Sequence, residues 1–192
     1  MKKFYIIIIL AGIISLNSFS QEKEKRPLVP NKPFWSGIID AGVIVPTGNF
    51  SNTYKTSLSL GLEIAYNPKP FFAVFVNFNY NFLNVKDSSN GSTPAIMEFG
   101  AGGRLYAGAK RLKFFLEAGI GDYVYHYTLY YGVLGAPSSY SSGYFGVKGG
   151  IGADWALGNL TTIFVKSNYH LIFTSGTKTT YFGAYVGIRN MF

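Results

Sequence analysis

Cysteine is absent from the sequence, and only two histidines occur. Without cysteine the chain can form no disulfide and carry no lipid on a cysteine thiol, and a zinc site is not expected. Neither a phosphate-binding glycine loop nor a dinucleotide-binding fingerprint is present. We therefore expect no metal and no cofactor.

Charge is also scarce. Charged residues make up 14% of the sequence, against about 25% in ordinary soluble domains, whereas aromatic residues reach 18%. Something other than water is therefore expected to cover much of the surface. The net charge is +8, but many basic residues lie in "QEKEKRPLVPNKP" and in short connections such as "AKRLK". No basic stripe is interleaved with stacking aromatics, so we expect no nucleic-acid partner.

The first segment, "MKKFYIIIILAGIISLNSFS", has two lysines, an apolar run and then small serines, as secretory signal peptides do. A membrane anchor is the alternative, but the apolar run is shorter than the ~20 residues that a spanning helix needs. We predict a signal peptide over 1–20, whose loss removes Lys2 and Lys3 and lowers the formal charge from +8 to +6. Residues 21–33 are a charged, proline-containing lead-in, and 34–192 form one domain.

Sustained helical periodicity is missing from residue 34 onward. Apolar residues instead alternate with small or polar ones, which predicts strands. Eight such runs occur in order: "FWSGIIDAGVIVP", "TSLSLGLEIAY", "FFAVFVNFNYNFLNV", "AIMEFGAGGRLYA", "KFFLEAGIGDYVYHYT", "GYFGVKGGIGADWAL", "LTTIFVKSNYHLIF" and "YFGAYVGIRNMF".

The connections between these runs alternate in length. Those after the first, third and fifth strands are long, and those after the second, fourth and sixth are short ("NPKP", "GAKR" and "GN"), while the last hairpin is intermediate. Tight turns at one end and long loops at the other are typical of outer-membrane barrels. We predict an all-β fold: an eight-stranded antiparallel up-and-down transmembrane β-barrel.

A soluble, lipocalin-like barrel would turn the apolar face inward, so the orientation of the faces decides between the two classes. The apolar face carries roughly thirty bulky side chains, too many for an eight-stranded interior. Within the strands, only Asp122 puts a charge on that face. The opposite, small and polar face carries Asp40, Glu63, Glu98, Arg104, Glu117, Lys148, Asp154, Lys166 and Arg189. A charge facing lipid at the bilayer centre costs about 2–4 kcal/mol, so this placement favours a membrane barrel.

Residues 34–192 resemble the small eight-stranded outer-membrane barrels of Gram-negative bacteria, of the OmpA-barrel and OmpX type. "AGVIVPTGNF" is similar to the close of that family's first strand, and "FFLEAGIGDYVY" to its fifth. Phe192, behind Val186 and Ile188, is similar to the signal read by the barrel-assembly machinery, although Asn190 stands where an aromatic or aliphatic residue is usual. The resemblance implies outer-membrane localisation, contact with outer-membrane lipid, and periplasmic termini.

Inside such a barrel the nine charged residues named above would be joined by His170. They could form a gated ion path or a proton relay. Alternatively they could form a salt-bridged plug, because buried charges must be paired. The near balance of sign and the narrow bore favour the plug, which predicts a closed lumen.

A second feature is the pair His126 and Thr128 on the lipid-facing side of the fifth strand. Outer-membrane lipid A deacylases resemble this in placing a His-x-Ser pair there, but no carboxylate partner is identifiable here, and a nucleophile needs a base and an orienting group. A lipid-modifying enzyme is therefore a remote alternative to an interfacial aromatic belt. We expect no catalytic residues.

The stretch "YVYHYTLYYGVLGAPSSYSSGYF" continues the fifth and sixth strands into a loop dense in tyrosine, serine and glycine. Such residues supply rigid contact area and adaptable hydrogen bonds in binding surfaces. They equally suit an interfacial girdle followed by a loop. The candidate residues for binding an extracellular ligand are Tyr125, Tyr127, Tyr130, Tyr131 and Tyr140.

The sequence thus predicts a non-enzymatic barrel with an envelope-structural role or a surface-binding (adhesive) role through its third long loop. The alternative is a porin or transporter for small or apolar molecules, similar to OmpW-type proteins.

Overall fold

The computed structural model describes residues 32–86, 94–109, 111–129 and 138–192. The predicted signal peptide, 1–20, and nearly all of the lead-in, 21–33, lie outside these ranges. Within them, no helix is long and apolar enough to cross a membrane, a finding that does not concern strands.

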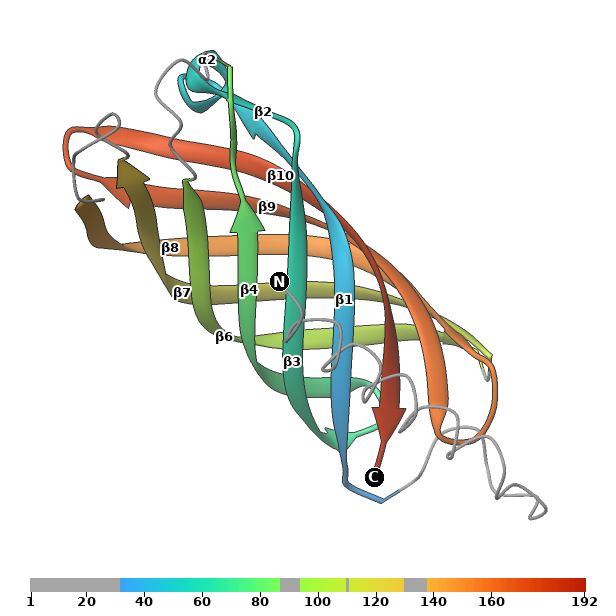
Figure 1. Ribbon diagram of the computed structural model, residues 1–192. Helices are drawn as coiled ribbons and strands as arrows, with labels where there is room; N and C mark the ends of the chain where they lie inside the picture. The colour runs from blue at the N-terminus through green and yellow to red at the C-terminus, as the bar shows by residue number, and fades with distance from the viewer. Residues whose placement is uncertain (1–31, 87–93, 110, 130–137) are drawn as a thin grey trace.

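Eight long antiparallel strands close into one barrel, which confirms the predicted fold (Figure 1). They are β1 (Phe34–Thr47), β3 (Ser57–Lys69), β4 (Phe72–Phe82), β6 (Ala95–Ala109), β7 (Leu112–Leu129), β8 (Ser138–Ala156), β9 (Thr161–Thr174) and β10 (Thr177–Met191). Each pairs with the next along the chain, as in a meander, and β10 returns to pair with β1.

The seam between β1 and β10 is a full ladder that runs from Ser36↔Met191 to Thr47↔Thr180. Two further backbone hydrogen bonds extend it, from the Trp35 N–H to the Phe192 carbonyl (3.2 Å) and from the Phe192 N–H to the Trp35 carbonyl (2.9 Å). In hydrocarbon every backbone group must be paired within the protein. The last strand therefore stays regular to its end, so that its backbone can pair with β1 and close the barrel.

The exposure of individual side chains decides which face is inside. Leu60, Val74 and Phe99 are 40%, 44% and 52% exposed, whereas Glu63 and Arg104 are 4% and 1% exposed. The apolar face is thus the outer wall and the ionisable face is the interior. A soluble barrel would have the reverse arrangement, so the chain is a membrane barrel.

Glycines on the inner face make room for aromatic rings from neighbouring strands. A methyl group on Gly102 would lie 2.6 Å from the ring of Phe75, and one on Gly152 would collide with the ring of Phe115. The rings lie directly against the neighbouring backbone, so the narrow interior is packed rather than hollow at these levels. This packing explains why small residues alternate with charged ones on that face.

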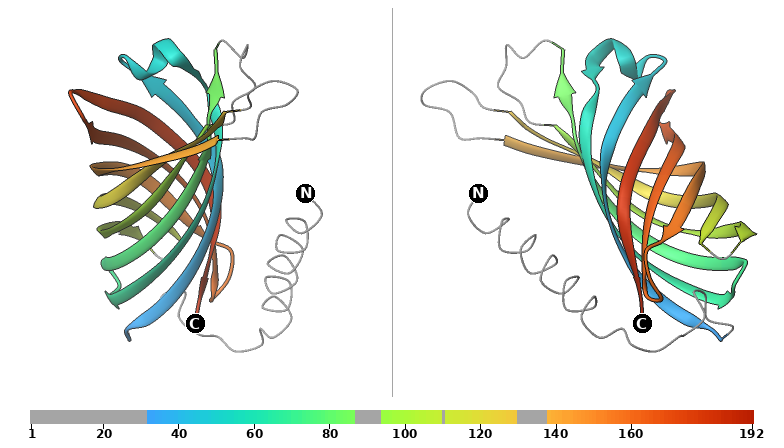
Figure 2. Two further views of the ribbon diagram at one scale, coloured as in Figure 1. Left: turned by 60° about the vertical axis from the view of Figure 1, so that its left-hand side comes forward. Right: turned by 90° about the vertical axis from the view of Figure 1, so that its right-hand side faces the viewer.

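The two ends of the barrel differ, as Figure 2 shows. We call the end that carries the short connections the turn end, where β1 begins and β10 ends, and the other the loop end. At the loop end the connection after β1 is not a plain loop. It forms a four-residue helix, α2 (Phe50–Thr53), and a short strand, β2 (Tyr54–Lys55). This strand pairs with β5 (Asn84–Val85), which lies in the connection after β4 at the same end of the barrel.

Candidate functional site

The ten ionisable residues predicted for the interior all lie inside the barrel, and each is at most 7% exposed. They fall into three groups along the bore, which differ in their partners. These groups are a central cluster, a cluster around Glu98 nearer the loop end, and a pair at the turn end.

The central cluster consists of Asp40, Glu63, Arg104, Glu117 and Lys166. The Arg104 guanidinium lies between two carboxylates, with Nη2 2.9 Å from Glu63 Oε2 and 2.6 Å from Glu117 Oε2. Lys166 Nζ lies 2.8 Å from Asp40 Oδ2 and 3.8 Å from Glu63 Oε2. These contacts join four strands, β1, β3, β6 and β7, to β9 across the bore.

Two aromatic rings pack against the central guanidinium. The Cζ atom of Arg104 lies 5.0 Å from the centroid of the Phe75 ring and 4.8 Å from that of Phe115. Cation–π contacts of this kind strengthen when water is excluded. The charges of the central cluster are therefore both paired and desolvated.

The Glu98 cluster contains Asn77, Asn79, Glu98, Lys148 and His170. Glu98 accepts hydrogen bonds from Lys148 Nζ (2.7 Å), Asn77 Nδ2 (2.9 Å) and Asn79 Nδ2 (2.8 Å). Lys148 also donates to Asn77 Oδ1 at 2.9 Å. Two of the three alternate asparagines of β4 thus have a structural explanation, because they solvate a buried carboxylate, while Asn81 donates to the Ile96 carbonyl.

Within the Glu98 cluster, His170 lies nearest the loop end. Its ring stacks on Tyr181 with centroids 4.3 Å apart, and its Nδ1 lies 3.0 Å from the Tyr123 hydroxyl. Glu98 Oε2 is 3.7 Å from the same nitrogen. The side chain is fully buried, and two tyrosine rings pack against it.

Above His170, apolar side chains fill the loop end of the bore. We call this group the apolar cap; it consists of Ile44, Phe50, Leu83, Ile96, Tyr123, Ile172 and Tyr181. Phe50 comes from α2. The centroid of its ring lies 4.7 Å from that of Tyr54 and 6.4 Å from those of Tyr125 and Tyr181. Phe50 was not among the predicted site residues; its one signal in the sequence is an aromatic residue inside the polar connection "TGNFSNTYK".

The predicted surface tyrosines separate into three situations. Tyr127 and Tyr140 are 40% and 48% exposed and stack on one another across β7 and β8, with centroids 5.3 Å apart. Tyr125 instead packs against the apolar cap, inside the barrel mouth. Tyr130 and Tyr131 lie outside the described residues.

Tyr54, on β2, lies close to the exposed stack. Burial raises the pKa of the Tyr54 hydroxyl, and the neighbouring Tyr127 raises it further. Lys55 follows on the same short strand, and the Lys86 N–H donates to the Thr53 carbonyl at 2.9 Å. Lys55 and Lys86 thus lie on two paired connections at the loop end, the same end as the tyrosines.

The remaining candidates have simple surroundings. The Thr128 hydroxyl lies 3.3 Å from that of Ser139. Asp122, on the lipid-facing side, is exposed. Among the described residues, no group of histidine and acidic side chains is arranged to hold a metal ion. The three residues resembling an assembly signal, Val186, Ile188 and Phe192, are 54%, 42% and 75% exposed on the outer wall.

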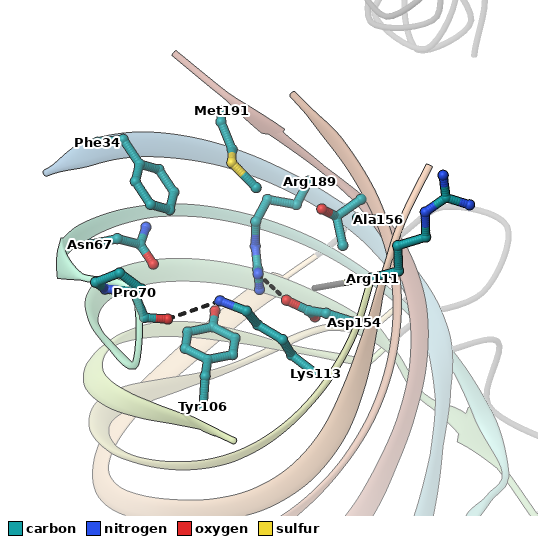
Figure 3. Close-up of a pocket in the computed structure, with 11 residues that line it drawn as sticks. Phe34, Asn67, Pro70, Tyr106, Arg111, Lys113, Asp154, Ala156, Arg189 and Met191 are labelled. Atoms are coloured by element: carbon teal, nitrogen blue, oxygen red, sulfur yellow. Dashed lines mark hydrogen bonds and ion pairs between the residues drawn. The ribbon is translucent and has the colours of Figure 1, made fainter. Parts of the chain in front are cut away.

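At the turn end a small cavity of about 30 Å³ opens beneath the central cluster (Figure 3). Arg189 of β10 pairs there with Asp154 of β8 through its Nη1 atom. Tyr106, Lys113 and Arg111 also line the cavity. Arg189 and Asp154 were predicted among the other interior charges, and the cavity itself was not predicted.

Several solved outer-membrane barrels share this architecture. Neisserial surface protein A (NspA) superposes with a TM-score of 0.65 at 15% identity, over 82% of this chain and 97% of that one. This is the outer-membrane barrel fold. Ail of Yersinia pestis (TM-score 0.53, 13% identity, 83% and 97% coverage) and OprG of Pseudomonas aeruginosa (0.53, 16%, 87% and 99%) share the outer-membrane barrel fold.

The outer-membrane barrel fold is shared without detectable sequence kinship. No protein-family model matches the chain, and comparison with curated proteins gives no significant match. Because barrels of this fold serve different roles, the role must be argued from the interior and from the two ends.

Proposed function

We propose that the chain is an integral protein of a Gram-negative outer membrane, that its lumen is closed, and that it is not an enzyme. Its role is to support the envelope or to bind a surface ligand at the loop end. The observation that carries the closed lumen is the sequence of contacts along the bore: the apolar cap, the Glu98 cluster and the central cluster lie one below another.

Closure has a physical reason at each level. The apolar cap excludes water from the loop end. Below it, the pairing of buried carboxylates with Lys148, Arg104 and Lys166 gives each of these charges a fixed partner. A hydrated ion would have to displace these partners, and breaking a buried pair costs about 3–5 kcal/mol.

Conductance tests this proposal against the porin alternative. Purified protein in planar bilayers is expected to give no large, stable conductance. A steady open channel, or uptake of small apolar molecules that depends on the protein, would instead support the OmpW-like role. Membrane fractionation combined with heat-modifiable gel mobility tests the localisation separately.

For surface binding, we propose an anionic saccharide as the ligand class. The flat faces of the Tyr127–Tyr140 stack suit sugar rings, and Lys55 and Lys86, on the paired connections that carry β2 and β5, add positive charge at the same end of the barrel. Ail, which shares the fold, has been solved in complex with the heparin analogue sucrose octasulfate (TM-score 0.54, 13% identity). This likeness supports the ligand class without locating the site.

Binding of sucrose octasulfate to protein in nanodiscs is the direct test. Lys55→Gln is expected to weaken binding, while Lys69→Gln, which removes an exposed lysine at the turn end, leaves it unchanged. Equal loss in both variants would mean that net charge, and not the loop end, attracts the ligand. If the wild-type protein does not bind sucrose octasulfate, the saccharide proposal fails and the envelope-supporting role is the one that stands.

We also propose that Val186, Ile188 and Phe192 are recognised by the barrel-assembly machinery before the barrel closes. Their exposure on the outer wall, on β10 and at the residue after it, supports this, because none of the three side chains is needed for packing inside the barrel. Crosslinking from position 186 to the machinery during assembly, reduced by Phe192→Ser, is the expected result. Normal assembly of Phe192→Ser would contradict the proposal.

A further inference from the structure

The turn-end cavity contains a buried cationic group whose hydrogen-bonding capacity is only partly used. Arg189 is 4% exposed, and its Nε and Nη2 atoms have no hydrogen-bond partner. Asp154 engages only Nη1. Leaving buried N–H donors of a charged group unpaired is costly, which points to an occupant outside the polypeptide.

The unpaired atoms form one edge of the guanidinium. Nε–H and the adjacent Nη2–H point in parallel, and this side-on fork matches two oxygens of a carboxylate or phosphate. Aromatic rings hold the fork in place, because Arg189 Cζ lies 5.4 Å from the centroid of the Tyr106 ring and 5.9 Å from that of Phe164. The donor pair is therefore oriented before any ligand arrives.

The lining of the cavity has an excess of positive charge. Lys113 and Arg189 lie beside one carboxylate, Asp154, at this end of the barrel, whereas the Arg111 guanidinium points away from it (Figure 3). Lys113 Nζ donates one hydrogen bond to the Pro70 carbonyl at 3.0 Å, which leaves two of its three donors for a ligand. A neutral occupant would leave this excess uncompensated.

A further donor comes from Tyr106. Its hydroxyl accepts a hydrogen bond from Arg104 Nη1 at 3.4 Å, so its own hydrogen is available. Asp154 acts in the opposite direction: its Oδ1 is buried and unpartnered and would repel an anion placed beside the fork. The site therefore has three donor groups and one opposing charge, each of which can be changed separately.

We propose that the turn-end cavity binds a phosphate oxyanion through the Nε–Nη2 edge of Arg189, assisted by Lys113 and Tyr106. The volume of about 30 Å³ admits the oxyanion oxygens while the rest of a larger molecule stays outside the barrel. A phospholipid headgroup and a soluble phosphate share this chemistry. The site lies at the opposite end from the proposed saccharide surface and does not depend on it.

The Nε–H resonance of Arg189 provides a local readout by NMR. The full sequence holds only four arginines, and Arg189→Lys identifies the signal by its loss. In nonionic-detergent micelles, which contain no phosphate, inorganic phosphate is expected to shift this signal saturably, whereas chloride at equal ionic strength does not.

Two substitutions are expected to act in opposite directions. Lys113→Gln should weaken phosphate binding about threefold, and Asp154→Asn should tighten it by a similar factor, since each changes one charge near the anion. Lys178→Gln, at the loop end, removes an exposed charge and leaves the affinity unchanged. A gain in affinity cannot result from damaged folding, so Asp154→Asn separates binding from stability, and Lys113→Gln remains informative if Asp154→Asn fails to fold.

The source of the oxyanion is resolved by adding phosphatidylglycerol to the micelles in place of phosphate. A shift that inorganic phosphate then fails to change identifies a lipid headgroup, and a shift with inorganic phosphate alone identifies a soluble ligand. The proposal is overturned if neither addition shifts the Arg189 signal, if chloride shifts it equally, or if Asp154→Asn weakens binding. Those outcomes would mean that water molecules, and not an anion, pair with Nε and Nη2 of Arg189.

Discussion

Replacing Arg104 with methionine tests whether the central cluster holds the barrel together. Arg104 is 1% exposed and donates to Glu117 through Nε at 2.8 Å and to Glu63 through Nη2 at 2.9 Å. Arg104→Met leaves both carboxylates buried without this partner. Removing one member of a buried pair costs about 3–5 kcal/mol, and Lys166, 3.8 Å from Glu63, offsets part of the loss. We therefore expect about 3 kcal/mol, at the lower end of that range.

Urea-dependent unfolding and refolding in lipid vesicles, followed by the gel mobility of unheated samples, measures this free energy. Adding Glu117→Gln to Arg104→Met removes one of the two carboxylates that have lost Arg104. This double variant should regain about 1–2 kcal/mol of the free energy of unfolding. Lys178→Met is the control, since exposed substitutions usually stay within about 0.5 kcal/mol. A loss below about 1 kcal/mol for Arg104→Met would show that the cluster is not a stabilising plug.

Three further predictions concern the packed interior and the loop end. Phe50→Ala should destabilise the apolar cap by about 3 kcal/mol, seen as faster proteolysis of the first long connection; an unchanged cleavage rate would contradict the assigned packing. Gly152→Ala should cost about 1–3 kcal/mol by overpacking, whereas Gly149→Ala, whose added methyl meets its nearest neighbour at 3.9 Å, should be neutral in the same urea assay. Tyr127→Ala combined with Tyr140→Ala should abolish binding of sucrose octasulfate without changing gel mobility, and retained binding would remove the tyrosine stack from the proposed surface.

Alternation along each strand was enough to predict the number of strands, their order and the two faces of the wall. The reason is that a period of two assigns every residue to a face without reference to its neighbours in space. Asp122 illustrates the precision of this step, because the one charge predicted on the outer face is exposed there.

Pairing between interior charges could not be predicted in the same way. Arg104 on β6 meets Glu63 on β3, although β4 lies between these strands in the barrel. Which side chains meet across the bore depends on the tilt and stagger of the strands, and neither is specified by the parity of a residue. The ionisable members of the interior network could therefore be predicted, but not their division into three groups.

The loop end shows a second limit. The connection after β1 reads as polar and turn-rich, yet it forms α2 and β2, and Phe50 inserts into the barrel mouth. A single aromatic residue in a short connection has no periodicity to reveal its direction. Its burial results from contacts with Tyr125 and Tyr181, which are distant in sequence.

The ladder between β1 and β10 has a consequence for biogenesis. It joins Ser36 to Met191, so a nascent polypeptide that lacks β10 must carry two unsatisfied strand edges. Contacts of such long sequence separation form slowly and expose intermediates to aggregation. We therefore expect insertion into the bilayer to follow translation of the final strand. Until then, the unfinished polypeptide needs protection from aggregation.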